Sequence, residues 1–183
     1  MRSVGLRSPC DKVGGLFYFG RLLDKIRAHA KGELPPDYEA SIEKWFDEKC
    51  TSFLRVRHDQ LVAWVNAGMT DEEILQSCFA WGQRPPEDEI YMWNEFNRKR
   101  GWNDEVSGLL RRRKIEKGMA ARSEIETVFQ FIDANEGRLP NTNHFGGTRR
   151  DEISLIVSGK HHRPLGQNSK ARNFSNGNGV LSR

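Results

Sequence analysis

Apolar side chains in the first 140 residues of this 183-residue chain recur every three or four positions and almost nowhere alternate as they would in a β-strand. An α-helix has about 3.6 residues per turn, so this spacing places apolar side chains on one helix face. One such stripe consists of Phe19, Leu22, Leu23, Ile26 and Ala30. The pattern predicts an all-α domain and excludes a nucleotide-binding enzyme built on a parallel sheet.

Glycines and capping residues divide these 140 residues into about seven short helices that form a compact bundle. Thr70 and Glu73 have the spacing of a capping box, in which each side chain satisfies a free backbone amide of the other residue. Ser123 and Glu126 repeat this spacing and predict the start of the last helix. The expected helices cover residues 19–31, 42–54, 59–67, 71–81, 87–100, 103–117 and 124–136. Five tryptophans, expected mainly in the core, are Trp45, Trp64, Trp81, Trp93 and Trp102.

The positive charge of the chain is concentrated at its C-terminal end. The formal net charge is +4 at pH 7, but residues 141–183 carry seven Lys or Arg and only two acids, which leaves residues 1–140 at −1. Gly, Asn and Ser make up 17 of those last 43 residues, so too few apolar side chains remain to offset the entropy of ordering the backbone. We therefore expect a helical domain over residues 1–140 and a basic, largely irregular and flexible tail over residues 141–183.

Other features exclude several classes of protein. No stretch approaches the roughly 20 apolar residues of a transmembrane helix, and no apolar run follows the N-terminal basic residues, so neither a membrane protein nor a secretory signal peptide is expected. Cys10, Cys50 and Cys78 are widely separated and odd in number, which favours free thiols in a reduced, cytoplasmic setting. No metal-binding motif is complete, so neither a metal nor a cofactor is expected.

The first expected helix carries the leading candidate site. Gly14 and Gly15 precede it, and free backbone amides in such a position can bind an anion. Four charged residues follow on the helix, namely Arg21, Asp24, Lys25 and Arg27. Together these six residues predict a small polar pocket for an anionic ligand near the first helix. The alternative is a solvated helix face on which Asp24 pairs with Arg21 and Arg27, each three residues away.

Two basic clusters on either side of Gly101-Trp102 point to a different partner. Basic side chains around an aromatic ring suit contacts with phosphates and a stacked base. Together with two arginines of the tail, the residues that could contact nucleic acid or a ribosome are Arg98, Lys99, Arg100, Arg111, Arg112, Arg113, Lys114, Arg149 and Arg150. The competing interpretation is a surface on which nearby acids, such as Glu95 and Asp104, pair with these bases.

Catalysis is a third alternative. The sequence identifies no Ser-His-Asp or Cys-His set, which leaves Asp24 or His58 as a candidate general base in a cleft. No metal motif accompanies either residue. The sequence therefore favours a binding or regulatory module without catalysis over an enzyme, and it leaves the oligomeric state open.

Short blocks of the sequence resemble a known family. These blocks are Leu6-Arg-Ser-Pro9, Gly14-Gly15, Arg21-Leu-Leu-Asp-Lys-Ile-Arg27 and Arg122-Ser-Glu-Ile125, followed by Phe129 and Asp133. Their order and spacing, from about residue 6 to residue 138, resemble the bacterial family known as domain of unknown function 5069. The resemblance implies a compact, mostly helical cytoplasmic domain. It brings no established activity, cofactor or catalytic residue, and the tail beyond residue 140 departs from it.

Overall fold

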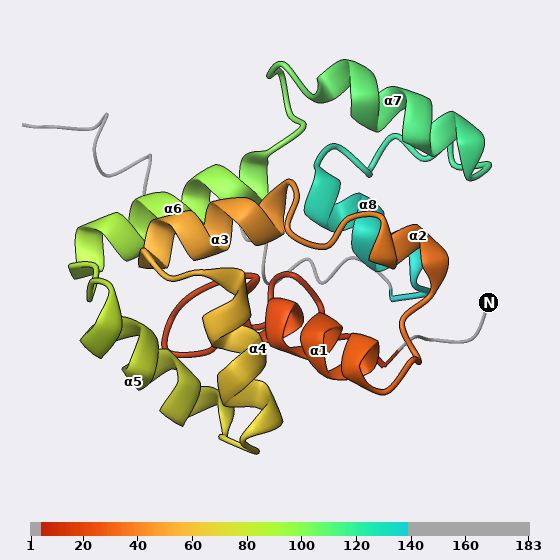
Figure 1. The fold of residues 1–183 in the computed structure, drawn as a ribbon. Helices are drawn as coiled ribbons and strands as arrows, with labels where there is room; N and C mark the ends of the chain where they lie inside the picture. The colour runs from red at the N-terminus through yellow and green to blue at the C-terminus, as the bar shows by residue number, and fades with distance from the viewer. Residues whose placement is uncertain (1–4, 139–183) are drawn as a thin grey trace, which may run out of the picture. The chain divides into compact units, whose positions relative to one another are not determined.

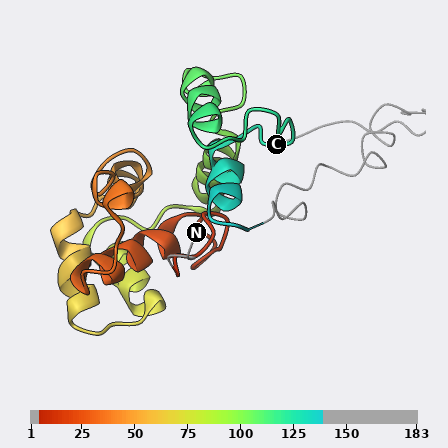
Figure 2. The same ribbon diagram turned by 90° about the vertical axis from the view of Figure 1, so that its right-hand side faces the viewer.

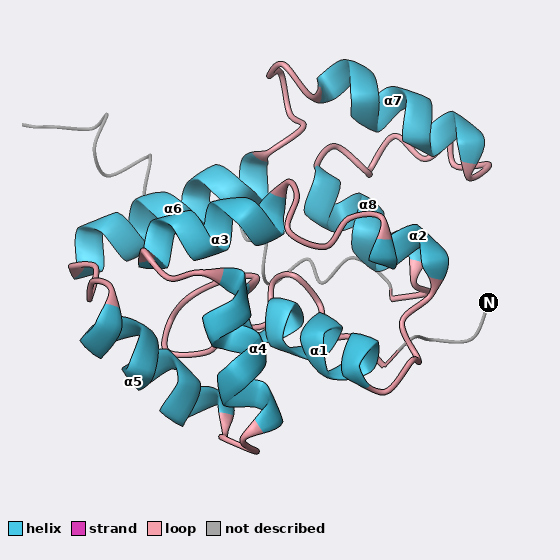
Figure 3. Cartoon of the chain, in the orientation of Figure 1, coloured by secondary structure: helices cyan, strands magenta, loops and turns pink. Residues whose placement is uncertain are grey.

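The structure, a computed structural model, describes residues 5–138 of the chain, which contain eight α-helices (Figure 1, Figure 3). The helices are α1 (Phe19–Ala30), α2 (Pro36–Glu39), α3 (Phe46–Leu54), α4 (His58–Asn66), α5 (Asp71–Trp81), α6 (Glu87–Lys99), α7 (Ser107–Glu116) and α8 (Val128–Asn135). Within the described residues the only strand-like contact is an isolated bridge between Val13 and Leu16. The prediction of an all-α fold is confirmed for this part of the chain. The predicted boundary near residue 140 and the basic tail over residues 141–183 lie outside the described residues.

Among these eight helices, none combines the length and the apolar character that crossing a membrane requires.

The connection between α1 and α3 differs from the single helix expected after Ser41. A separate four-residue helix, α2, begins at Pro36, where the proline ring fixes φ at a helical value and no helical N–H is lost. Helix α3 begins only at Phe46, because Glu43 and Trp45 have φ values of 58° and 57° and interrupt the right-handed backbone. The helix prediction is therefore wrong for residues 42–45, which form turns and a bend instead.

The last two helices also begin later than expected. Helix α8 uses Thr127 and Gln130 as its capping box rather than Ser123 and Glu126, and the side-chain oxygen of Gln130 accepts from the Thr127 N–H at 2.9 Å. Helix α7 begins at Ser107, because the carboxylate of Asp104 accepts from the backbone N–H groups of Gly101 and Val106 and closes a turn before the helix. A side chain that hydrogen-bonds to the nearby backbone competes with helix formation. At Asp104 the turn forms, and the helix begins three residues later.

The core forms where α1 packs on α4 and where α8 packs on α6 and α7. In Figure 2, α7 and α8 lie on one side of the domain and α4 and α5 on the other. Leu22 and Leu23 of α1 are fully buried. An aromatic cluster joins the loop before α1 to α3 and α8, since the Phe129 ring lies 6.1 Å from the ring of Tyr18 and 5.1 Å from that of Phe46.

The tryptophans do not fill the core as expected. Trp93 is buried and stacks on Phe53 at 4.7 Å, whereas Trp45, Trp81 and Trp102 are exposed. Each of these three tryptophans lies at or just outside a helix terminus: Trp45 precedes α3, Trp81 ends α5 and Trp102 follows α6. The core expectation is therefore wrong for these three residues.

The three cysteines are free and buried, which leads to a testable prediction. Burial raises the pKa of the Cys10 and Cys78 thiols from 9.0 to about 12 and that of Cys50 well above its ordinary value. The thiolate is the reactive form, so its population at neutral pH falls by about a thousandfold for Cys10 and Cys78. We expect no reaction of the folded chain with a disulfide reagent such as dithiobisnitrobenzoate, and the release of three thiols when urea unfolds it. Rapid modification of any of the three in the folded chain would contradict this burial.

Candidate functional site

Arg21, a predicted site residue, is almost completely buried in an ion-pair network. Its guanidinium donates to the Glu136 carboxylate at 3.0 Å and forms a second, shorter contact with the same carboxylate, and it donates to the Arg7 carbonyl oxygen at 2.7 Å. Tyr38 and Arg138 also donate to Glu136. The cationic partners lower the pKa of Glu136 although burial opposes them. The network connects α1 to the C-terminal end of α8, where Glu136 is the capping residue.

Lys25, one turn further along α1, is buried beside the carboxylate of Asp47. The Nζ of Lys25 lies 2.5 Å from Oδ2 of Asp47 and 3.2 Å from Oγ of Ser41, and the Tyr18 hydroxyl donates to Oδ1 of Asp47 at 2.8 Å. Burial lowers the pKa of Lys25, and Asp47 opposes this shift by stabilising the ammonium. Asp47 is fully buried at the start of α3. Its carboxylate accepts hydrogen bonds from Lys25 of α1 and from Tyr18, which directly precedes α1.

Asp24 and Arg27 join a second group of ion pairs, which Arg7 connects to Arg21 through its backbone carbonyl group. Asp24 accepts from Nε of Arg7 at 2.8 Å and lies 3.5 Å from Arg27, while Asp71 accepts from Arg7 at 2.5 Å and from Arg27 at 2.7 Å. The expected surface pairing of Asp24 is confirmed for Arg27 but not for Arg21, because Arg21 points to Glu136.

Gly14 and Gly15 lie in the turn between Val13 and Leu16, away from these networks. Gly14 has a φ of +54°, and a β-carbon there would lie 2.1 Å from Cδ2 of Leu75, so close packing against α5 accounts for this glycine. The Gly15 carbonyl oxygen accepts from the Asn94 side chain of α6 at 2.8 Å. The structure therefore separates the two glycines from Arg21 and Lys25.

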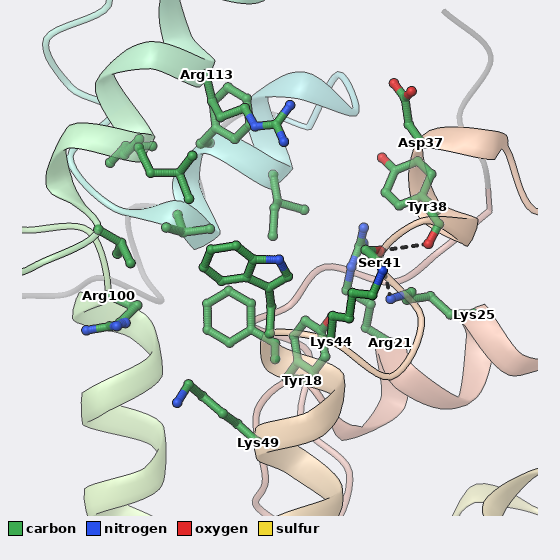
Figure 4. A pocket seen from close by; sticks show the side chains of 18 residues that line it. Tyr18, Arg21, Lys25, Asp37, Tyr38, Ser41, Lys44, Lys49, Arg100 and Arg113 are labelled. Carbon is green, nitrogen blue, oxygen red and sulfur yellow. Dashed lines mark hydrogen bonds between the residues drawn. The ribbon is translucent and has the colours of Figure 1, made fainter. Parts of the chain in front are cut away.

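Arg21 and Lys25 line a pocket of about 260 Å³ between α1, the turn before α3, and helices α7 and α8 (Figure 4). Aromatic and aliphatic side chains form most of its wall, including Tyr38, Trp45, Phe46, Leu109, Leu110 and Phe131. The charged residues that line it are Arg21, Lys25, Lys44, Lys49, Arg100, Arg113 and Asp37. Figure 4 shows Arg100 and Lys49 on one side of this pocket and Arg21, Lys25 and Lys44 on the other. Six cations and one acid thus surround an apolar interior.

Four of the six cations are already paired with acids. Arg21 pairs with Glu136 and Lys25 with Asp47, as described above. Arg100 contacts Asp104 and Glu105, and Arg113 lies 3.3 Å from Glu116. Lys44 and Lys49 differ, because neither forms an ion pair within residues 5–138. Lys44 donates to the Ala40 carbonyl oxygen at 3.2 Å, and both lysines are exposed, so they are the pocket cations without an ion pair in this part of the chain.

The backbone at the pocket is strained. Trp45 combines a φ of 57° with a ψ of −116°, a region that side chains with a β-carbon rarely adopt, and Glu43 also has a positive φ. Such conformations cost on the order of 1–3 kcal/mol each and persist where the surrounding structure requires them, often at binding sites. With this backbone conformation Trp45 lines the pocket and stays 56% exposed.

Sequence reasoning did not find Lys44, Lys49, Trp45 and Tyr38 as site residues. The sequence does contain a signal, since Lys44 directly precedes the aromatic pair Trp45-Phe46 and Lys49 follows three residues after it, as basic residues also do around Trp102. The expected helix over residues 42–54 would place Trp45 in the core, so the sequence does not suggest Trp45 as part of a site.

The basic clusters proposed for nucleic acid are largely paired with neighbouring acids. Arg98 and Lys99 contact Glu95, and Arg112 and Arg113 contact Glu116. Lys114 instead donates to two backbone carbonyl groups, those of Arg122 and Ile125. Arg111 is exposed, while Arg149 and Arg150 lie outside the described residues. Nucleic-acid binding stays a prediction.

The two candidate general bases lie in different environments. The Asp24 carboxylate forms ion pairs with Arg7 and Arg27. His58 lies with Nδ1 at 3.0 Å from a carboxylate oxygen of Glu43, and its Nε2 is buried without a hydrogen-bond partner in the described residues. His58 lines a second cavity, of about 290 Å³, on the other side of the Lys25–Asp47 pair. Within residues 5–138 no group of three or more His, Cys, Asp or Glu side chains is arranged to hold a metal ion.

The fold and the pocket define a small all-helical domain with a cation-lined, apolar pocket. The family model described as "Domain of unknown function (DUF5069)" matches residues 3–138, most of the chain, and the chain belongs to this family. The resemblance noted in the sequence is thereby confirmed. No curated protein matches the chain.

Proposed function

We propose that the helical domain is a binding module, without catalysis, for a small amphipathic anion: a carboxylate or phosphate carried on an aromatic or apolar group. The observation that carries the proposal is the position of Lys44 and Lys49, two exposed lysines that form no ion pair within residues 5–138, beside the apolar wall of the pocket. Ligand pockets in general combine such a wall with a few polar groups that fix orientation. An anionic group would neutralise the lysines while its apolar part contacts Trp45 and Phe131.

The low polarity of the pocket wall strengthens this attraction. A charge pair interacts more strongly when apolar surface replaces water around it, because the effective dielectric constant falls. Arg21 and Lys25 also line the pocket, but each is paired with a buried carboxylate, so the attraction of an anion comes mainly from Lys44 and Lys49. A neutral ligand of the same shape would gain only the apolar contact.

The hydrogen bonds at Ser41 favour binding over catalysis. The Ser41 hydroxyl donates to the carbonyl oxygen of Tyr38 at 2.7 Å and accepts from Lys25 at 3.2 Å. A nucleophilic serine needs a base that accepts its proton. The Ser41 proton is already donated to the Tyr38 carbonyl oxygen, and Lys25 is paired with Asp47, so these contacts order the pocket wall and leave no free base beside Ser41.

A titration of the ¹⁵N-labelled full chain with phenyl phosphate tests the proposal by NMR. We expect shifts of the Lys44, Trp45 and Lys49 amides, and much smaller shifts with the neutral benzyl alcohol. Lys44→Ala and Lys49→Ala should each weaken phenyl phosphate binding about three- to tenfold, since each removes one charge contact from a partly exposed site.

Lys31→Ala is the matched control, because it removes one exposed positive charge that does not line the pocket. It should leave the affinity unchanged. Absence of shifts at the pocket with phenyl phosphate and with benzoate, or equal effects of all three lysine variants, would show that the pocket is not an anion site.

A further inference from the structure

Helix α6 presents an apolar stripe to solvent. Met92 is 57% exposed and Phe96 48%, although both are large apolar residues. With Glu89 they line a groove between α3 and α6, two helices that run side by side in Figure 1. Isolated exposed apolar residues need no explanation, but two on one helix face beside a groove indicate an interaction surface.

Charged residues extend this stripe at both ends. Glu89, Met92, Phe96 and Lys99 are spaced i, i+3, i+7 and i+10, the heptad spacing at which two helices pack along a seam. Glu89 forms no ion pair within residues 5–138. Lys99 is exposed and contacts Glu95 of its own helix at 3.0 Å. The seam thus begins with an unpaired acid and ends with an accessible base.

We infer that a second copy of this chain packs on the stripe, with the two α6 helices antiparallel. Met92 and Phe96 lie symmetrically about position 94, and Glu89 and Lys99 lie symmetrically about the same position. A single antiparallel register therefore sets Met92 of each copy opposite Phe96 of the other and Glu89 of each copy opposite Lys99 of the other. The contact is self-complementary, as a twofold dimer requires.

The charge pattern selects this orientation over the parallel one. In a parallel pair the acidic first turns, which contain Glu87, Asp88 and Glu89, would lie side by side and repel each other. In the antiparallel pair each acidic turn lies beside the Lys99 end of the other helix. Two ion pairs about 15 Å apart along the helix axis then flank the apolar contact, since ten residues rise by that length.

Sedimentation equilibrium of the full chain, over concentrations that extend into the hundreds of micromolar, tests the inference. A contact made by one helix from each copy is small, so we expect a weak monomer–dimer equilibrium. Phe96→Glu and Met92→Glu should each weaken the dimer at least tenfold, because each places a charge in the apolar centre. Ile115→Ser removes an equally exposed apolar side chain from α7 and should have no effect.

Charge reversal tests the register. Glu89→Lys and Lys99→Glu should each weaken the dimer severalfold, since each sets like charges opposite each other, and the double variant should restore it. Circular dichroism confirms that each variant is folded. A chain that stays monomeric throughout, a dimer that Phe96→Glu leaves intact, or a double variant as weak as the single ones would each overturn the inference.

Discussion

Replacing Asp47 by alanine should lower the free energy of unfolding by about 3–5 kcal/mol, because it leaves a buried ammonium without its counter-charge. Asp47 is fully buried, and the side chain of its partner Lys25 is 3% exposed. The Tyr18 hydroxyl would lose its acceptor in the same variant. Urea denaturation of the wild type and Asp47→Ala, followed by circular dichroism, measures the difference.

Two further variants show that the loss comes from the unpaired charge. Lys25→Met combined with Asp47→Leu removes both charges and should be clearly more stable than Asp47→Ala, because apolar side chains can replace a buried ion pair at little cost. Glu116→Ala breaks exposed ion pairs with Arg112 and Arg113 and should change the stability by no more than about 0.5 kcal/mol. A loss below about 1 kcal/mol for Asp47→Ala would argue against a buried, charged pair.

The second large effect is expected at Gly82, where alanine should cost about 3 kcal/mol by overpacking. A β-carbon at this position would lie 2.2 Å from the carbonyl oxygen of Leu54 and 2.8 Å from that of Arg55. These backbone atoms end α3 and cannot rotate away as a side chain can. The chain would have to separate the end of α5 from the end of α3 to accept the methyl group, and thermal or urea unfolding would report this as lower stability.

Gly108 provides the matched control for the same substitution. It lies inside α7, and a β-carbon there would meet no atom within 4 Å. Because alanine restricts the unfolded chain and favours helix, Gly108→Ala should stabilise the domain by up to about 1 kcal/mol. Opposite signs at the two glycines are the expected result. Equal small effects would contradict the close approach at Gly82.

The helices could be predicted in outline because their signals are local. Thr70 and Glu73 do form the capping box that begins α5, with the Thr70 N–H donating to Glu73 at 2.8 Å. The errors occur where two local signals compete. The capping pairs at positions 123 and 127 are both plausible by spacing, and the structure uses Thr127, while Ile125, two residues before it, is buried outside the helix.

The candidate site could be predicted only in part. The sequence predicts Arg21 and Lys25 as site residues, and both line the pocket. It does not predict their partners, because Glu136 lies 115 residues from Arg21 and Asp47 lies 22 residues from Lys25. Proximity in the sequence also suggests Gly14 and Gly15, but these glycines contact α5 and α6 instead.

The sequence by itself determined the helical architecture, the end of α5 at Gly82 and the family, since these depend on periodicity, caps and the order of short blocks. Only the tertiary structure decided which charges on α1 are neutralised, that Lys44 and Lys49 are left unpaired within residues 5–138, and that Gly82 touches α3. The physical reason is the distance along the sequence over which the interactions act. A helix is fixed by hydrogen bonds between residues four apart, whereas a buried charge takes whichever partner the packing of distant helices brings to it.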